Sequence, residues 1–423
     1  MINDQQGREL PLSARPLMPG QQGYRQLGYL QQSDLQRYRR QRRLVVGPRL
    51  LVAESLLLVM ALLSAALGAV IQLISRAHHP EPTPYSSPQA ALIASQVDRL
   101  LTNEVAQQQF SGSVLIARGG RVLLSKGYSM ADWEKQVPNT PHTKFYLGST
   151  TKQFTAMAIL ILQERGKLHV RDHLCSYIAP CPPAWQTVTI HDLLTHTSGI
   201  PQLDGSSLST ASLQAWIASF DGVPLVSTPG SQFSYCNICY QILGYVVEQV
   251  SGKPYSEFLQ QAIFAPLQMR NSGFDPHYLS LPDHAVGYAS WQVKDISVTW
   301  DVAPQWSFLF GSGLLYSTVE DLYRWNQALS RHTLVSQQSL DEAFTPYVAS
   351  QYAGSRYGYG WFIAQAPTPG HRLIWHDGRV AGFRSYIGYY SDDGITIIVL
   401  SNLSTLDELT QASALARIVF AHP

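Results

Sequence analysis

Residues 145–163 read FYLGSTTKQFTAMAILILQ, a short polar segment that runs directly into a long apolar one. The apolar part is long enough for a helix, and the residues before it favour a helix that begins next to Ser149. Residues three apart in a helix lie on one face, so the amine of Lys152 is expected to reach the hydroxyl of Ser149. The stretch therefore predicts a serine and a lysine in contact at a helix start.

This pair has the chemistry that a nucleophilic serine requires. A serine hydroxyl is a weak nucleophile until a base takes its proton, and lysine serves as that base only when burial or positive potential lowers its pKa. A helix N-terminus supplies such potential, together with an amide that stabilises an oxyanion. Ser149 is the only serine followed by lysine at this spacing. The alternative is a helix-capping serine with a solvent-exposed lysine one turn later.

A second candidate motif is the only Tyr-x-Asn tripeptide in the chain, formed by Tyr235 and Asn237 ahead of a helix predicted over residues 242–250. A tyrosine hydroxyl near the lysine would relay a proton to the leaving group, and the asparagine amide would hold the substrate carbonyl and the lysine. The alternative is an aromatic core residue followed by a helix-capping asparagine.

A third candidate motif is His376-Asp377-Gly378, followed by Arg379. Gly378 would let a substrate backbone approach an edge strand closely, and the amide of Arg379 would be a second oxyanion donor. The imidazole of His376 would bind or polarise the carboxylate end of the substrate. The alternative is a structural histidine on a strand.

Hairpin patterns at both ends of the predicted domain indicate its fold class. Residues 112–117 and 121–125 flank an Arg-Gly-Gly turn, and residues 384–390 and 395–400 flank a second turn. A helical pattern over residues 91–105 precedes the first hairpin. The chain is therefore predicted to be α/β (α+β), with one antiparallel sheet formed by the two ends of the domain, flanking helices and a helical insertion.

The N-terminal part predicts a membrane anchor. An arginine-rich stretch over residues 37–49 precedes an almost wholly apolar run that is long enough to span a bilayer. Because the arginines come before this run, the N-terminus is expected in the cytoplasm. We expect a disordered basic tail over residues 1–49, a transmembrane helix over 50–75, a proline-rich linker over 76–89 and an extracytoplasmic domain over 90–423. A cleaved secretory signal is the alternative.

Charge and cysteine content narrow the possible partners. The formal net charge is +1 with 14% charged residues, which argues against nucleic acid as a partner. Cys175 and Cys181 would lie in an oxidising compartment and are expected to close a small loop, whereas Cys236 and Cys239 are expected to be buried free thiols. The spacing of cysteines and histidines does not resemble a structural zinc site, and we expect neither a metal nor a cofactor.

The three motifs, in this order, resemble the active site of the serine β-lactamase and D-alanyl-D-alanine peptidase superfamily. Tyr-x-Asn and His-x-Gly resemble more narrowly the branch with class C β-lactamases, D-alanyl-D-alanine carboxypeptidases and related esterases. Residues 110–115, 189–201 and 313–318 also match segments typical of that family. The resemblance covers residues 90–423 and implies a sheet flanked by helices, with an all-helical subdomain and the catalytic serine in the cleft between them.

Carried over motif by motif, the resemblance implies a role for each candidate residue. Ser149 would be the nucleophile, Lys152 its base and Tyr235 the proton relay, while Asn237, His376, Gly378 and Arg379 would bind substrate, with the amides of Ser149 and Arg379 as the oxyanion hole. A structural role is expected for His196, in the segment 189–201.

The third motif departs from most β-lactamases, which have a lysine in place of His376. A neutral imidazole holds a carboxylate less strongly than an ammonium does, although the neighbouring Arg379 could compensate. We therefore expect a peptidase or esterase acting on a small-molecule or peptidoglycan-like substrate, with a β-lactamase as the alternative. A binding module that is acylated without turnover, as a sensor or a peptidoglycan tether, is the non-enzyme alternative.

Overall fold

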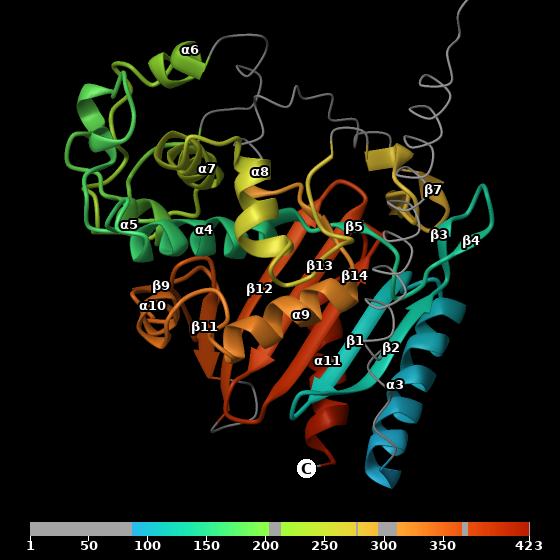
Figure 1. Ribbon diagram of the computed structural model, residues 1–423. Coiled ribbons are helices and arrows are strands. Elements are labelled where there is room, and N and C mark those ends of the chain that lie inside the picture. The colour runs from blue at the N-terminus through green and yellow to red at the C-terminus, as the bar shows by residue number, and fades with distance from the viewer. Residues whose placement is uncertain (1–86, 203–212, 276–277, 295–310, 366–370, 423) are drawn as a thin grey trace, which may run out of the picture. The chain divides into compact units, whose positions relative to one another are not determined.

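An antiparallel sheet joins the two ends of the domain (Figure 1). The computed structural model describes residues 87–202, 213–275, 278–294, 311–365 and 371–422. Within these ranges the main sheet has eight strands in the order β2-β1-β14-β13-β12-β11-β10-β9. The strands are β1 (Gly112–Arg118), β2 (Arg121–Tyr128), β9 (Val348–Ala349), β10 (Ser355–Tyr357), β11 (Phe362–Gln365), β12 (Arg372–Val380), β13 (Phe383–Tyr390) and β14 (Ile395–Ser401). Both predicted hairpins and the pairing of the two ends are confirmed.

The sheet is buried on both faces by different helices. Side chains alternate across a strand, so Leu115 of β1 and Ile398 of β14 enter one hydrophobic core, whereas Val114 and Val399 enter the other. The second core is covered by α3 (Pro88–Ala106) and α11 (Glu408–Phe420), and the first by α4 (Lys152–Glu164) and α9 (Val319–Ser330). The expected antiparallel sheet with flanking helices is confirmed.

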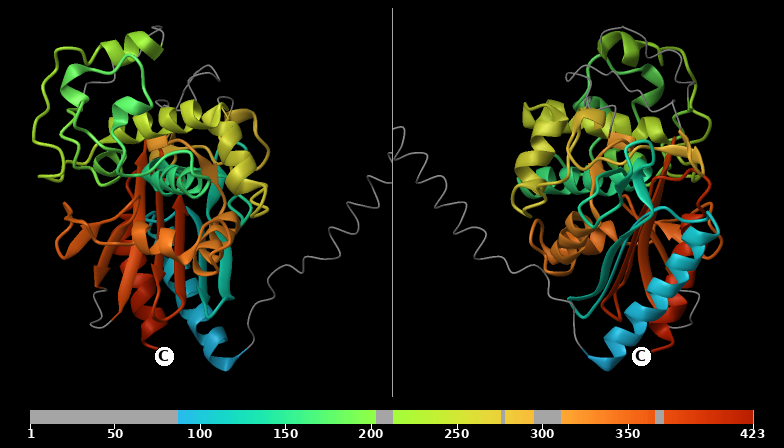
Figure 2. Two further views of the ribbon diagram at one scale, coloured as in Figure 1. Left: turned by 60° about the vertical axis from the view of Figure 1, so that its left-hand side comes forward. Right: turned by 90° about the vertical axis from the view of Figure 1, so that its right-hand side faces the viewer.

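A helical region lies over one end of the sheet (Figure 2). It consists of α4, α5 (Ile190–Leu194), α6 (Leu213–Ala218), α7 (Asn237–Ser251) and α8 (Tyr255–Leu259), continued by a π-helical turn at Gln260–Phe264. Every side chain of α4 from Lys152 to Leu162 is buried, because the sheet and the other helices surround it. The apolar run that follows Ser149 in the sequence therefore forms the central helix of the domain, α4.

The remaining elements are short. The helical ones are α10 (Gln337–Ala343) and the turns Gly148–Thr151 (η1), Leu174–Ser176, Pro183–Trp185 and Tyr278–Ser280. The strands outside the main sheet are β3 (Met130–Asp132), β4 (Val137–Pro138), β5 (Phe145–Tyr146), β6 (Tyr288–Ser290), β7 (Val293–Lys294) and β8 (Tyr316–Ser317). Of these, β5 pairs with β8 directly before the turn that carries Ser149.

The predicted tail and transmembrane helix, over residues 1–75, lie outside the described residues. In the described part of the chain no helix is both long enough and apolar enough to cross a bilayer. The membrane anchor therefore stays a prediction.

Both pairs of cysteines form disulfides. Cys175 and Cys181 are bridged as expected, with an S–S distance of 2.00 Å. The expectation of free thiols at Cys236 and Cys239 was wrong, because these residues are also bridged, at 2.06 Å. Cys236 is the extended N-cap residue of α7, and its sulfur accepts a hydrogen bond from the amide of Cys239, which brings the two side chains together on the first turn.

Candidate active site

The turn that carries Ser149 is fixed against the sheet. Within η1, Gly148 adopts a positive φ of 51°. On β13, the buried hydroxyl of Ser385 donates to the carbonyl of Leu147 at 2.6 Å and lies 2.8 Å from the hydroxyl of Thr150. These bonds on either side of Ser149 hold the position of the serine relative to the strands.

Gly378 of β12 makes this close approach possible. A Cβ atom at Gly378 would lie 1.9 Å from the carbonyl oxygen of Leu147 and 2.4 Å from the hydroxyl of Ser385. The sequence suggested that this glycine makes room for a substrate backbone. In the structure a glycine is needed here for a different reason, because the turn that carries Ser149 occupies the space that a side chain would fill.

The amine of Lys152 lies at the centre of the site. It is 3.1 Å from the hydroxyl of Ser149, 2.7 Å from Oδ1 of Asn237 and 2.7 Å from the carbonyl oxygen of Ser312. Its side chain has 0% exposure, and burial lowers the pKa of Lys152 well below 10.5, partly opposed by the charge of Asp377. A neutral amine has two N–H groups and one lone pair, so it donates to Asn237 and Ser312 and accepts the proton of Ser149.

Tyr235 lies on the other side of the serine. Its hydroxyl is hydrogen-bonded to that of Ser149, and its ring centre is 4.8 Å from the amine of Lys152. Burial raises the pKa of Tyr235 well above 10.0, so the phenol stays protonated at neutral pH. Ser149, Lys152, Tyr235 and Asn237, which come from two separate motifs, are thus brought together by α4 and the start of α7.

His196 supports the tyrosine from behind. Its Nδ1 accepts a hydrogen bond of 3.0 Å from the amide of Cys236, between Tyr235 and Asn237. Its ring is 4.4 Å from that of Tyr235, and burial holds the pKa of His196 well below 6.5. This geometry agrees with the structural role expected for His196.

His376 is buried beneath the strand side of the site. It has 1% exposure; its Nε2 lies 3.1 Å from the hydroxyl of Tyr357, and its Nδ1 lies 2.5 Å from the carbonyl oxygen of Asp377. A carbonyl only accepts, so Nδ1 carries the proton and Nε2 accepts from Tyr357. Burial lowers the pKa of His376 to about 4, which keeps the imidazole neutral. In this arrangement both ring nitrogens are already engaged by the protein.

The backbone amide of Arg379 faces the catalytic turn, but its side chain does not. β11 pairs with β12 only as far as Trp375. Beyond Trp375, the edge of β12 that faces away from β13 is therefore open to η1. In the two-residue hairpin after β12, the pair Val380–Phe383 exchanges ladder bonds, so alternation turns the Arg379 amide to this open edge. A Cβ atom at Gly148 would lie 2.6 Å from that nitrogen. The amide therefore lies where an oxyanion donor is needed.

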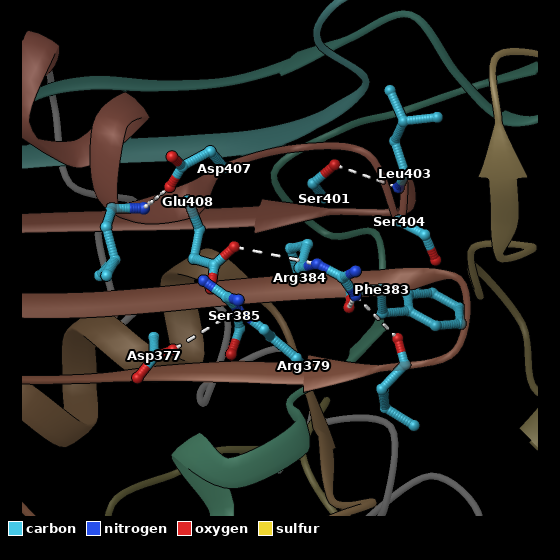
Figure 3. A network of polar contacts seen from close by, with 12 residues as sticks. Asp377, Arg379, Phe383, Arg384, Ser385, Ser401, Leu403, Ser404, Asp407 and Glu408 are labelled. Atoms are coloured by element: carbon cyan, nitrogen blue, oxygen red, sulfur yellow. Dashed lines mark hydrogen bonds and ion pairs between the residues drawn. The ribbon is translucent and has the colours of Figure 1, made fainter. Parts of the chain in front are cut away.

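The guanidinium of Arg379 lies on the opposite face of the sheet (Figure 3). Its Nε donates to Oε1 of the fully buried Glu408, at the start of α11, at 2.6 Å, and lies 3.7 Å from Oδ2 of Asp377. Glu408 also lies 3.9 Å from Nε of Arg384. The suggestion that the Arg379 side chain compensates for the missing lysine is not favoured by this geometry.

Several residues that complete the site were not found by sequence reasoning. They are Ser312, which accepts from Lys152, Ser385, which holds the catalytic turn, and Tyr357, which donates to His376. The glycines beside Ser312 and Tyr357 mark tight backbone segments but predict no partner. Across the described ranges, no group of histidine, cysteine, aspartate and glutamate side chains is arranged to hold a metal ion.

Comparisons with known proteins identify related chains. The family model described as Beta-lactamase matches residues 97–420. The putative penicillin-binding protein PbpX of Bacillus subtilis is 34% identical over 74% of this chain and 76% of its own length. Penicillin-binding protein 4* of the same species is 30% identical over 75% and 74%.

Solved structures show the same fold. The octameric penicillin-binding protein homologue from Pyrococcus abyssi has a TM-score of 0.68 and 29% identity, covering 77% of each chain. The penicillin binding protein from Bacillus halodurans has a TM-score of 0.62 and 28% identity, covering 74% of this chain and 98% of that one. EstCE1, a hydrolase with promiscuous acyltransferase activity, is 21% identical, and this likeness concerns the fold alone.

Proposed function

Because this chain belongs to the β-lactamase family of penicillin-binding proteins and related serine hydrolases, we propose that it hydrolyses esters or amides through an acyl-enzyme on Ser149. One observation carries the proposal. The Lys152 amine, fully buried, lies 3.1 Å from the Ser149 hydroxyl and has two other acceptors for its N–H groups. That arrangement leaves the lone pair of a neutral amine directed at the proton that must be removed.

Acylation begins when Lys152 takes the proton of Ser149 as the serine oxygen attacks the substrate carbonyl. The amides of Ser149 and Arg379 stabilise the oxyanion that forms. The proton then passes from Lys152 through the Tyr235 hydroxyl to the leaving group as the bond to that group breaks. The products are the acyl-enzyme and the free alcohol or amine, and Lys152 is neutral again.

Deacylation reverses these roles with water as the nucleophile. Water enters at the position of the leaving group, beside Tyr235, and Lys152 accepts its proton through the same relay. The tetrahedral intermediate collapses by releasing the serine oxygen, which takes the proton back. The net reaction consumes one water and yields a carboxylic acid, with Ser149 restored.

The substrate class follows from the relatives and the site. The relatives are named as penicillin-binding proteins, which supports reactivity with peptides ending in D-alanyl-D-alanine and with β-lactams. EstCE1, a hydrolase with promiscuous acyltransferase activity, and the D-amino acid amidase from Ochrobactrum anthropi share the fold. We favour peptidase or esterase activity over β-lactam hydrolysis, because His376 replaces the lysine of most β-lactamases and is neutral.

Labelling with a fluorophosphonate or a fluorescent penicillin tests the nucleophile. Ser149→Ala should abolish labelling and Lys152→Ala should reduce it greatly, whereas Ser330→Ala, at the exposed end of α9, should label as the parent does. Equal labelling of all variants would reject these roles. A burst of one equivalent of product without further turnover would instead identify a binding module that is acylated but not recycled.

The proposed location is the outer face of a cell membrane, with a single anchor over residues 50–75. The arginines before the apolar run support a cytoplasmic N-terminus, and two disulfides in the domain are compatible with an oxidising compartment. Membrane fractionation of the full chain, followed by protease treatment of intact cells, tests this proposal. The domain should sediment with membranes and be cleaved from outside.

A further inference from the structure

The charges on the strand side of the site indicate which leaving groups the enzyme accepts. The cation nearest to the third motif, Arg379, is directed away from Ser149. Asp377 and Arg379 are the two neighbours of Gly378 on β12, and successive side chains of a strand point to opposite faces of the sheet. Gly378 faces the catalytic turn, so Asp377 and Arg379 face α11. Figure 3 shows the guanidinium of Arg379 beside the carboxylate of Glu408. A buried carboxylate therefore already holds this guanidinium.

The charge that does act on the site is negative. Asp377 is buried, with its Oδ1 3.8 Å from Nδ1 of His376, and accepts a hydrogen bond of 3.1 Å from Tyr352. Burial is the main cause of the shifted pKa values of Lys152, His376, Tyr235 and Tyr357, and the charge of Asp377 acts on each of them in the upward direction. In the described part of the chain, the only basic side chain that acts on these groups is Lys152 itself, which lowers the pKa of His376.

The segments of the domain outside the described ranges add no lysine or arginine, and His277 is their only histidine. Residues 203–212, 276–277, 295–310 and 366–370 contain no lysine or arginine, whereas they do contain Asp204, Asp295 and Asp301. A substrate carboxylate next to the scissile bond would thus meet a neutral imidazole. Asp377 and its ion-pair partner Arg379 lie behind it on the α11 face of β12, so neither offers the substrate a free cation. Such a carboxylate loses hydration on entering the site and gains no ion pair in return.

We infer that this site selects acyl donors whose leaving group is uncharged, such as neutral esters, thioesters and amides, against donors that carry a free carboxylate beside the scissile bond. The inference rests on the proposed function and narrows its substrate class. It favours hydrolysis of neutral esters and amides over a peptidase for D-alanyl-D-alanine, whose leaving group carries such a carboxylate. For a thioester, the Ser149 oxygen displaces the thiol, which leaves with the relayed proton, and water then releases the carboxylic acid from Ser149.

A matched pair of substrates tests the selection with the wild-type protein. The benzoylglycyl thioesters of thioglycolate and of thioglycolamide share one scissile bond and differ by one carboxylate. The rate of thiol release gives kcat/KM for each thioester. Each kcat/KM is then divided by the rate of uncatalysed hydrolysis of the same thioester, which removes the difference in leaving-group reactivity. The amide form should be preferred by on the order of tenfold or more, and the preference should be carried by KM and by kcat/KM.

A matched pair of variants assigns the selection to Asp377. Asp377→Asn should lower the preference severalfold by speeding up the charged thioester, whereas Asp393→Asn, in the turn at the far end of β13, makes the same change in net charge and should leave it unaltered. If Asp377→Asn does not fold, the ratio of kcat/KM values for the two thioesters with the wild type still decides.

Equal or faster turnover of the charged thioester by the wild type would overturn the inference while leaving the hydrolase proposal intact. Failure of the proposed function would be seen differently, as no turnover of either thioester and no labelling of Ser149.

Discussion

The two sides of the active site differ in how far their polar groups remain available to a substrate. On the helical side, the amine of Lys152, at the start of α4, contacts both the hydroxyl of Ser149 in η1 and the amide oxygen of Asn237 at the start of α7. On the strand side, His376 and Arg379 have polar side chains that are already bound to Tyr357 and Glu408. The difference teaches that the side chains placed for the proposed chemistry come from the helical side, whereas β12 presents its backbone amides and its shape to the site.

The largest effect is expected at the base. Lys152→Met keeps the volume of the buried side chain but removes the amine, and kcat should fall by about 10²- to 10⁴-fold because the serine loses its proton acceptor. Lys167→Met, at an exposed position beyond the end of α4, is the control and should retain full activity. Steady-state kinetics measure both, with thermal unfolding to confirm that each is folded. Activity retained in Lys152→Met would mean that another group activates Ser149.

A smaller effect is expected at the proton relay. Tyr235→Phe preserves the ring beside Lys152 and removes only the hydroxyl, so kcat should fall on the order of 10²-fold for poor leaving groups, which depend on protonation. For activated aryl esters, whose leaving groups need no proton, the loss should be much smaller. Tyr389→Phe, in β13, is the control. An equal loss for both kinds of ester would contradict a relay role and indicate a positioning role instead.

The strand side should show its effect in stability rather than in turnover. The pKa of His376 is lowered from 6.5 to about 4 by burial, so the unfolded state binds a proton first as the pH falls. The contribution of His376 to the free energy of unfolding is therefore fully present above about pH 6.5. It decreases as the pH falls toward 4, by up to about 3 kcal/mol.

Urea unfolding at pH 7.5 and pH 5 measures this effect. His376→Gln should reduce the difference in unfolding free energy between the two pH values. His191→Gln is a useful comparison, because burial also lowers the pKa of His191 to about 4 at a position in α5 away from Ser149. An unchanged pH dependence in His376→Gln would show that the ring is not buried neutral.

The smallest effect is expected for the side chain of Arg379. Because its backbone amide, and not its guanidinium, faces Ser149, Arg379→Ala should change kcat/KM for neutral esters by no more than about threefold. The Arg379 side chain has 54% exposure, but its loss leaves Glu408 with a weaker set of partners, so thermal stability should decrease. A loss of activity comparable to that of Tyr235→Phe would place the guanidinium in substrate binding and remove the contrast between the two sides.

Local patterns in the sequence were enough to locate the catalytic elements. Ser149 and Lys152 lie one helical turn apart, so their contact depends on the geometry of a single helix start. The hairpin β1–β2 forms around an Arg-Gly-Gly turn, and its pairing with β14 agrees with apolar strands at both ends of the domain. These features depend on residues close together in the chain, or on patterns that repeat along it.

Pairings between distant side chains were not determined in this way. The sequence predicted substrate-binding roles for His376 and Arg379, but it could not show that Tyr357 donates to one and Glu408 accepts from the other. The disulfide between Cys236 and Cys239 depends on the extended conformation of an N-cap residue, which cysteine spacing alone does not specify.

The sequence by itself thus indicated which residues are candidates for the proposed chemistry, because the spacing of a helix turn and of a hairpin is a local property. Only the tertiary structure decided how deeply Lys152 is buried and where the charges around it are directed. Burial and electrostatic potential are sums over everything that surrounds a group, and for Lys152 those surroundings come from α7, the segment at Ser312 and β12.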